Sequence, residues 1–93
     1  MVKIEWSLYA YEDLESIFNF IAKDSIFYAN RQVEVLVSRV EILEAFPQSG
    51  RIVPEFNNEL IRELIEGNYR VVYKIQKDFI SILRVHHAAK DIS

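Results

Sequence analysis

Most of the chain's cationic and imidazole side chains lie between Ile61 and Asp91. Metal-free cleavage of a phosphodiester needs a base for the ribose 2′-hydroxyl, a cation for the developing phosphorane charge and an acid for the leaving oxygen. Residues of the right types for these roles are Glu55, Arg62, Arg70, His86 or His87, and Lys90. The alternative is structural: Arg62 and Arg70 pair with Glu63 or Glu55 on a solvated face, and the histidines are hydrogen-bonded packing residues.

Several other chemistries lack the residues they need. The chain has no cysteine, which excludes a thiol nucleophile, a disulfide framework and cysteine-ligated zinc. With only Gly50 and Gly67, it has no glycine-rich phosphate loop. His86 and His87 are adjacent on a predicted strand and point to opposite faces, so they do not form a joint metal site. We expect neither a metal nor a cofactor.

Composition is that of an ordinary globular protein. The 93 residues are 51% hydrophobic and 27% charged, which predicts one domain spanning residues 1–93. The opening MVKIEWS is not typical of a secretory signal, and no apolar run is long enough to cross a membrane. We therefore expect a cytoplasmic protein without a membrane partner.

Charge is unevenly distributed along the chain. The net charge is −3 and the isoelectric point is about 5.3, which argues against non-specific nucleic-acid binding. Residues 1–46 are acidic, whereas residues 47–93 carry a slight excess of cations. Any strong positive patch must therefore depend on how the cationic side chains are aimed.

Two helices are predicted in the first half, after a short strand over Val2–Trp6. Ser7 and Ser25 stand where N-caps are expected. The first helix should end near Lys23-Asp24 and the second before Pro47, which disfavours helical geometry at the preceding residue. The apolar positions at helical spacing are Ala10, Leu14, Ile17, Phe18 and Ile21, then Ala29, Val33, Leu36, Val37, Val40 and Leu43. Such a short connection predicts an antiparallel helical hairpin.

The second half is predicted to be a small sheet. A loop over residues 47–59 precedes strands at Leu60–Ile65, Tyr69–Gln76 and Phe79–His87, which are joined by tight turns. We expect the aromatic face of the middle strand to lie on the helices and the Arg70 face to be open. The last strand is apolar on both faces, which favours a central position. The predicted fold class is α+β, with the helical hairpin packed on a mainly antiparallel sheet.

Short motifs run in order over nearly the whole chain. They are W-S at Trp6-Ser7, A-x-x-D-L from Ala10, I-A-x-D-S from Ile21, L-E-x-F-P from Leu43, G-R-x-V-P-E from Gly50, I-R-E-L from Ile61, G-N-Y-R-x-V-Y from Gly67 and V-x-H-A-A-K-D from Val85. In this order and spacing the chain resembles toxins of the RelE/ParE superfamily, from bacterial type II toxin–antitoxin systems. The resemblance implies the RelE/ParE toxin fold, which is the fold described above, and a cognate antitoxin encoded by an adjacent gene.

The resemblance also implies one of two targets. RelE-like members are metal-independent endoribonucleases that cleave mRNA on the ribosome, and that activity would assign catalysis to Arg62, Arg70 and His87. ParE-like members poison DNA gyrase without a nuclease site and are not enzymes in this sense. For that reading the expected target-binding residues are Arg51, Glu55, Arg84, His86 and Lys90.

The C-terminal motif and the charge bear on the choice of target. V-H-H-A-A-K-D resembles the ParE-like ending, with His87 at the histidine and Lys90 in place of the usual arginine. A low isoelectric point poorly suits a protein that works among ribosomal phosphates. Both observations favour gyrase inhibition, linked to plasmid stabilisation or growth arrest. A RelE-like nuclease and a non-toxic, antitoxin-binding homologue remain the alternatives.

Overall fold

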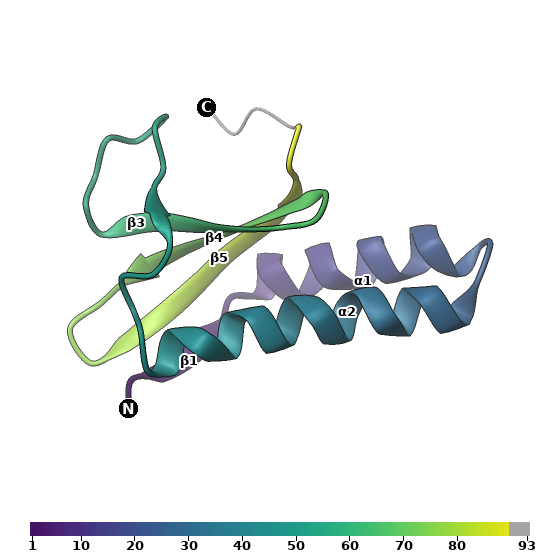
Figure 1. Ribbon diagram of the computed structural model, residues 1–93, viewed down its shortest axis with the longest axis horizontal. Coiled ribbons are helices and arrows are strands. Elements are labelled where there is room, and N and C mark those ends of the chain that lie inside the picture. The colour runs from purple at the N-terminus through teal and green to yellow at the C-terminus, as the bar shows by residue number, and fades with distance from the viewer. Residues whose placement is uncertain (90–93) are drawn as a thin grey trace.

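The computed structural model describes residues 1–89, in which two helices pack on one face of a five-stranded sheet (Figure 1). The elements are β1 (Lys3–Trp6), α1 (Leu8–Ala22), α2 (Ile26–Glu41), the 3-10 turn η1 (Ile42–Glu44), β2 (Arg51–Ile52), β3 (Ile61–Glu66), β4 (Tyr69–Ile75) and β5 (Phe79–His87). The predicted α+β fold is confirmed. No helix within these residues is long and apolar enough to span a membrane.

The helix boundaries follow from local capping. The Ser7 hydroxyl accepts a hydrogen bond from the backbone N–H of Ala10 at 3.0 Å, and the Ser25 hydroxyl accepts one from Tyr28 at 3.2 Å. Both bonds satisfy N–H groups that the first helical turn leaves without a helical partner. The predicted caps are therefore confirmed. α2 and the turn η1 that follows it end before Pro47, as predicted from the effect of a proline on the residue before it.

The sheet has the strand order β1-β5-β4-β3-β2. β1 runs parallel to β5, and the other neighbouring strands are antiparallel. β5 is therefore flanked on both sides, as its two apolar faces predicted, although β4 is the middle strand. β2 is a two-residue strand inside the region predicted as a loop, and it pairs Arg51 with Glu63 and Ile52 with Arg62. Two residues are too few to show the alternation of side chains by which a strand is predicted from sequence.

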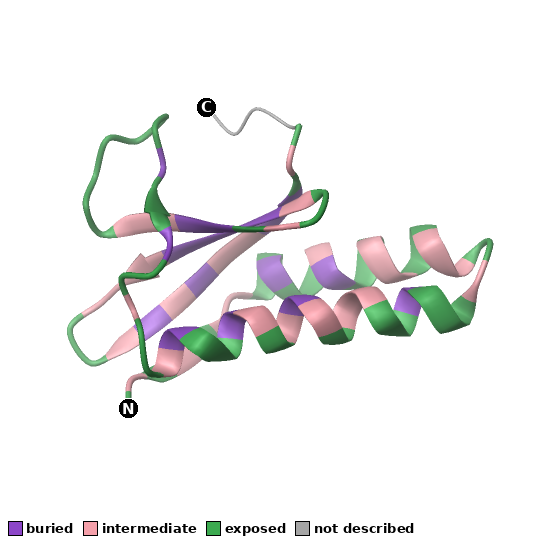
Figure 2. Ribbon diagram, in the orientation of Figure 1, coloured by how far each residue is buried: buried purple, intermediate pink, exposed green. Residues whose placement is uncertain are grey.

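The main core lies between the helical hairpin and the sheet. Tyr73 and Val71 are fully buried in it, and Tyr69 and Ile75 pack against it, so the predicted placement of this face is confirmed. The helix ends nearest the sheet carry most of the buried helical positions, whereas the far tip of the hairpin projects past the sheet (Figure 2). The tip is left with exposed apolar side chains: Phe20, Ile26, Phe27 and Tyr28.

The opposite face of β4 is not open, and this prediction was wrong. Arg70 is 6% exposed and Val72 is 3% exposed. The segment after β2 rises on the side of the sheet away from the helices (Figure 1), where Val53 is fully buried. Glu55 of the same segment contacts Arg70. Part of the predicted loop over residues 47–59 thus covers the face on which Arg70 lies.

Candidate functional site

A buried ion-pair cluster lies on this covered face of the sheet. Glu63 on β3 has a side chain with no exposed surface, and Arg70 on β4 donates to its Oε1 from Nε, at 2.7 Å, and from a terminal nitrogen. Arg51, the partner of Glu63 across the β2–β3 pair, donates to Oε2. The carboxylate is therefore held between two guanidinium groups, which is the pairing that burial of a charge requires.

Glu55 completes this Arg51–Glu55–Glu63–Arg70 cluster. Its two carboxylate oxygens each lie 3.4 Å from a terminal nitrogen of Arg70. Burial acts to lower the pKa of Arg70, but hydrogen bonds and attraction from Glu55 and Glu63 raise that pKa above its ordinary value. Two cations face two carboxylates, so the cluster is electrically neutral when all four groups are ionised.

His86 lies beside the cluster. It pairs with Arg70 across β4 and β5, and it is buried. Of the expected target-binding residues, Arg51, Glu55 and His86 are therefore gathered around Arg70. Lys90 lies outside the described residues.

Arg62 belongs to the other face of the sheet. Its partner across β3 and β4 is Tyr73, whose side chain points into the main core. The Arg62 guanidinium donates to the carbonyl oxygens of Glu59 and Gly50, both at 3.0 Å, and of Gln48 at 3.4 Å. Arg62 thus clamps both ends of the chain excursion over residues 50–59.

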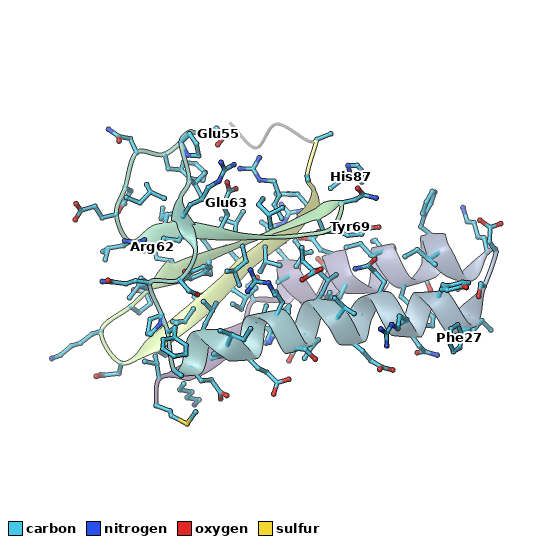
Figure 3. The ribbon with its side chains drawn as sticks, viewed as in Figure 1. Phe27, Glu55, Arg62, Glu63, Tyr69 and His87 are labelled. Carbon is cyan, nitrogen blue, oxygen red and sulfur yellow. The ribbon has the colours of Figure 1, made fainter. Side chains whose placement is uncertain are left out.

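His87 is exposed at the end of β5. Its ring lies edge-on to Tyr69, with centroids 5.7 Å apart. Tyr69 pairs with His87 across the strands just as Arg70 pairs with His86, so side-chain alternation puts His87 and Arg70 on opposite faces. Figure 3 shows Arg62 and His87 far apart along the sheet, and Arg70 lies on the opposite face, so these three residues do not meet around one point.

Arg84 is turned toward α1 and does not join the cluster. It contacts both oxygens of Asp13, at 2.8 and 3.0 Å, and Asp13 also accepts the backbone N–H of Val85 at 2.8 Å. Burial acts to raise the pKa of Asp13, but the Arg84 and Val85 hydrogen bonds bring it below its ordinary value. The pairing of β1 with β5 stops at Ile82, so Asp13 satisfies an N–H beyond the end of β1.

Two structural positions were not identified from the sequence as part of this arrangement. Glu63 was considered only as a partner in a solvated ion pair; the available signal was an acid that shares one strand face with Ile61 and Ile65. Tyr73 donates to the Pro47 carbonyl at 2.8 Å and accepts from the Gly50 N–H at 2.9 Å. A Cβ at position 50 would lie 2.6 Å from the tyrosine oxygen, so only glycine permits this approach.

No group of three or more histidine, cysteine, aspartate or glutamate side chains with metal-site geometry occurs among residues 1–89. In the Arg51–Glu55–Glu63–Arg70 cluster, both guanidinium groups are already bound to carboxylates. Such an arrangement fixes the sheet and its covering segment, and it presents a neutral rather than a cationic surface.

Comparison with known proteins gives a consistent set of relatives. A sequence model of the family described as the ParE toxin of the type II toxin–antitoxin system parDE matches residues 4–92. Toxin RelE2 of Caulobacter vibrioides is 27% identical over 90 residues, covering 97% of this chain and 99% of the relative.

Solved structures share the fold. A chain from the chromosomal ParDE system of P. aeruginosa superposes with a TM-score of 0.78 at 22% identity, covering 94% of this chain and 96% of that one. A chain from the RelBE2 toxin–antitoxin complex of Mycobacterium tuberculosis gives 0.69 at 20% identity, covering 92% and 96%.

Proposed function

The chain belongs to the ParE toxin family of the RelE/ParE superfamily, and on that premise we propose that this type II toxin acts by binding and inhibiting DNA gyrase. We place its action in the cytoplasm, where gyrase and its DNA are found. In this proposal the protein is not an enzyme. The Arg51–Glu55–Glu63–Arg70 cluster, with His86 beside it, shapes a surface for the target rather than a reaction centre.

The observation that carries this proposal is the position of the three side chains a nuclease would use. Arg70 is held by two carboxylates, Arg62 holds backbone carbonyls on the other face, and His87 lies apart against Tyr69. General acid–base catalysis needs its groups within hydrogen-bond reach of one substrate. Their separation supports a binding toxin over a metal-free ribonuclease.

Charge supports the same conclusion. Contacts to nucleic-acid phosphates gain affinity from cations that release counterions. Here the guanidinium groups of Arg51 and Arg70 are already neutralised by Glu63 and Glu55, and the whole chain is acidic.

A supercoiling assay with purified gyrase tests the proposal. We expect excess toxin to inhibit supercoiling and to accumulate cleaved DNA, and toxin induction alone to stop replication before translation. Toxin premixed with its antitoxin is the matched control. Normal supercoiling in the presence of excess folded toxin would contradict the proposal.

A ribosome-dependent mRNA endonuclease is the second candidate, favoured by the relative named Toxin RelE2. Toeprinting on translating ribosomes distinguishes it. New cuts in the ribosomal A site that disappear with Arg70→Ala would support the nuclease, whereas the gyrase proposal expects no cuts. Induction that leaves growth unaffected would point to the third alternative, a non-toxic antitoxin-binding homologue.

An antitoxin encoded by the adjacent gene is the proposed partner in the cell. The structural relatives come from toxin–antitoxin systems, and the hairpin tip exposes Phe20, Ile26, Phe27 and Tyr28. Clustered exposed apolar side chains mark protein interaction surfaces. Co-expression with the neighbouring small reading frame should give a complex that co-purifies, and failure to co-purify would count against this partner.

A further inference from the structure

The start of α1 carries large apolar side chains that are exposed to solvent. Leu8, Tyr9 and Tyr11 are 70%, 64% and 58% exposed, whereas Ala10 between them is buried. The ring of Trp6 stacks on that of Tyr11, with centroids 6.1 Å apart. Exposed apolar side chains are ordinary when they are scattered, but a group of them marks an interaction surface. Tyrosine and tryptophan are also enriched among the residues that contribute most to binding.

This surface is separate from the hairpin tip that we propose for the antitoxin. α1 begins beside the sheet, and the tip lies at its other end, past the sheet (Figure 1). Phe20 of the tip lies roughly 13 Å farther along the helix axis than Tyr11, at about 1.5 Å of rise per residue. Different segments of a partner can therefore occupy the two exposed groups.

The surroundings of this surface are acidic. Residues 4–22 include carboxylates but no lysine or arginine. Glu12 and Glu15 are exposed and take part in no ion pair among residues 1–89. They follow Leu8 at positions i+4 and i+7, so these three side chains share one face of the helix. The helix dipole favours acidic side chains early in a helix, but it does not account for the exposed rings beside them.

Arg84 shows how a cation is held beside these rings. Its guanidinium lies over the Tyr9 ring, with Cζ 5.8 Å from the centroid, and pairs with Asp13 at 2.8 Å. Hydrogen bonds to Asp13 raise the pKa of Arg84, although burial acts against this, and the charge of Glu12 adds to the rise. An aromatic face and a carboxylate thus stabilise the cation together. No cation of the described residues pairs with Glu12 or Glu15 in the same way.

We propose that the start of α1 is a docking surface for a basic segment of a partner protein. An apolar side chain of that segment packs against Leu8 and the Tyr11 ring. A lysine or arginine one helical turn farther along α1 pairs with Glu12 and Glu15, away from the positive end of the helix dipole. An acidic segment, a nucleic acid or the same surface of a second copy would be repelled. The inference does not depend on whether gyrase or the ribosome is the target.

The test is an NMR titration of the full chain with a synthetic peptide of sequence LLRRLLRR, blocked at both ends. We expect the peptide to shift the amide signals of residues 8–15 and the indole N–H signal of Trp6, the single tryptophan of the chain. Binding should weaken as the salt concentration is raised, because salt screens exposed charges. The peptide LLEELLEE, which has the same apolar positions and the opposite charge, should cause no such shifts.

A pair of double variants tests the role of the carboxylates. Glu12→Gln combined with Glu15→Gln should weaken binding of LLRRLLRR at least about threefold, since exposed ion pairs are individually weak but both are removed. Glu34→Gln combined with Glu41→Gln is the matched control, because it removes the same charge from exposed positions of α2. That control should bind the peptide like the wild type.

A second pair of variants tests the role of the rings. Tyr11→Ser should weaken peptide binding, whereas Tyr28→Ser should not, because Tyr28 is equally exposed but belongs to the hairpin tip. If Tyr11→Ser does not fold, the glutamate variants still test the surface, since their side chains are exposed.

Three results would overturn the proposal. One is a double variant at Glu12 and Glu15 that is folded, by its dispersed amide spectrum, and binds LLRRLLRR as tightly as the wild type. Another is equal binding of LLEELLEE, which would reject a basic segment as the occupant. The third is a set of shifts centred on Tyr28 instead of residues 8–15, which would place the peptide on the hairpin tip.

Discussion

Arg70 and Glu63 are bonded diagonally across β3 and β4, with Arg70 Nε 2.7 Å from Glu63 Oε1, although neither residue is directly opposite the other. Directly opposite Arg70 on β3 is Ile65, and directly opposite Glu63 on β4 is Val72. Both side chains lie almost fully out of solvent, so removing either one leaves a buried charge without one of its partners.

Removing Glu63 should therefore destabilise the protein strongly. We expect Glu63→Ala to lower the free energy of unfolding by about 3–5 kcal/mol, since it leaves two guanidinium groups without their shared carboxylate. Urea denaturation followed by circular dichroism measures the loss. The control is Glu5→Ala, which breaks an exposed pair with Lys3 at 3.5 Å and should change stability by less than about 1 kcal/mol. Equal losses in the two variants would contradict this account.

The hydrogen bond that the Val85 N–H donates to Asp13 predicts that stability depends on pH. The pKa of Asp13 is lowered in the folded state, so its contribution is present above the ordinary carboxyl pKa near 3.8 and is lost as the pH falls through the folded value. Asp13→Asn should melt at a lower temperature than the wild type at pH 7, and the difference should shrink below about pH 4. Thermal unfolding over a pH series tests this. Asp24→Asn, at an exposed position, should show no such trend.

Tyr73 ties the loop after η1 to the sheet. Its hydroxyl is the partner of both the Pro47 carbonyl and the Gly50 N–H, and Tyr73→Phe removes both hydrogen bonds in a buried position. We expect a loss of about 1–3 kcal/mol in the free energy of unfolding. Tyr11→Phe is the matched control, because Tyr11 is exposed and stacks on Trp6 through its ring. A loss at Tyr73 no larger than at Tyr11 would show that the two hydrogen bonds are not stabilising.

The sequence was sufficient for the helices, their serine caps and the three long strands, because these depend on local periodicity and on capping chemistry. It was also sufficient to predict which face of β4 meets the helices, since the aromatic and aliphatic side chains of Tyr69, Val71, Tyr73 and Ile75 share one face, whereas the other carries both cations of the strand. Residues close together in the sequence are enough to determine these features.

The candidate site could not be predicted in the same way. Whether Arg70 meets solvent or Glu55 depends on the path of residues 50–59, which Arg62 fixes through three backbone carbonyls. The pairing of Arg70 with Glu63 depends on the register of β3 against β4. The sequence motifs contain all of these residues, but only the tertiary fold decides that Arg62 and Arg70 lie on opposite faces.

Arg62 provides the last prediction, because a clamp and a catalytic cation respond differently to substitution. If Arg62 holds the 50–59 excursion, Arg62→Ala should speed hydrogen exchange at the Val53 N–H, which donates to Ile61 at 3.1 Å, by about tenfold or more through easier local opening. Amides of the main core, such as that of Val71, should exchange at nearly the wild-type rate. Hydrogen exchange followed by NMR measures both.

Substitution by lysine separates the two roles. A lysine keeps the charge but cannot reproduce the fork that reaches Gly50 and Glu59 together, so Arg62→Lys should still loosen the excursion. Arg31→Ala, at an exposed position on α2, should leave the exchange rate at Val53 unchanged. If Arg62→Ala leaves exchange at Val53 as slow as in the wild type while abolishing toxicity, the clamp is not the role that matters. Arg62 would then have to act on the target directly.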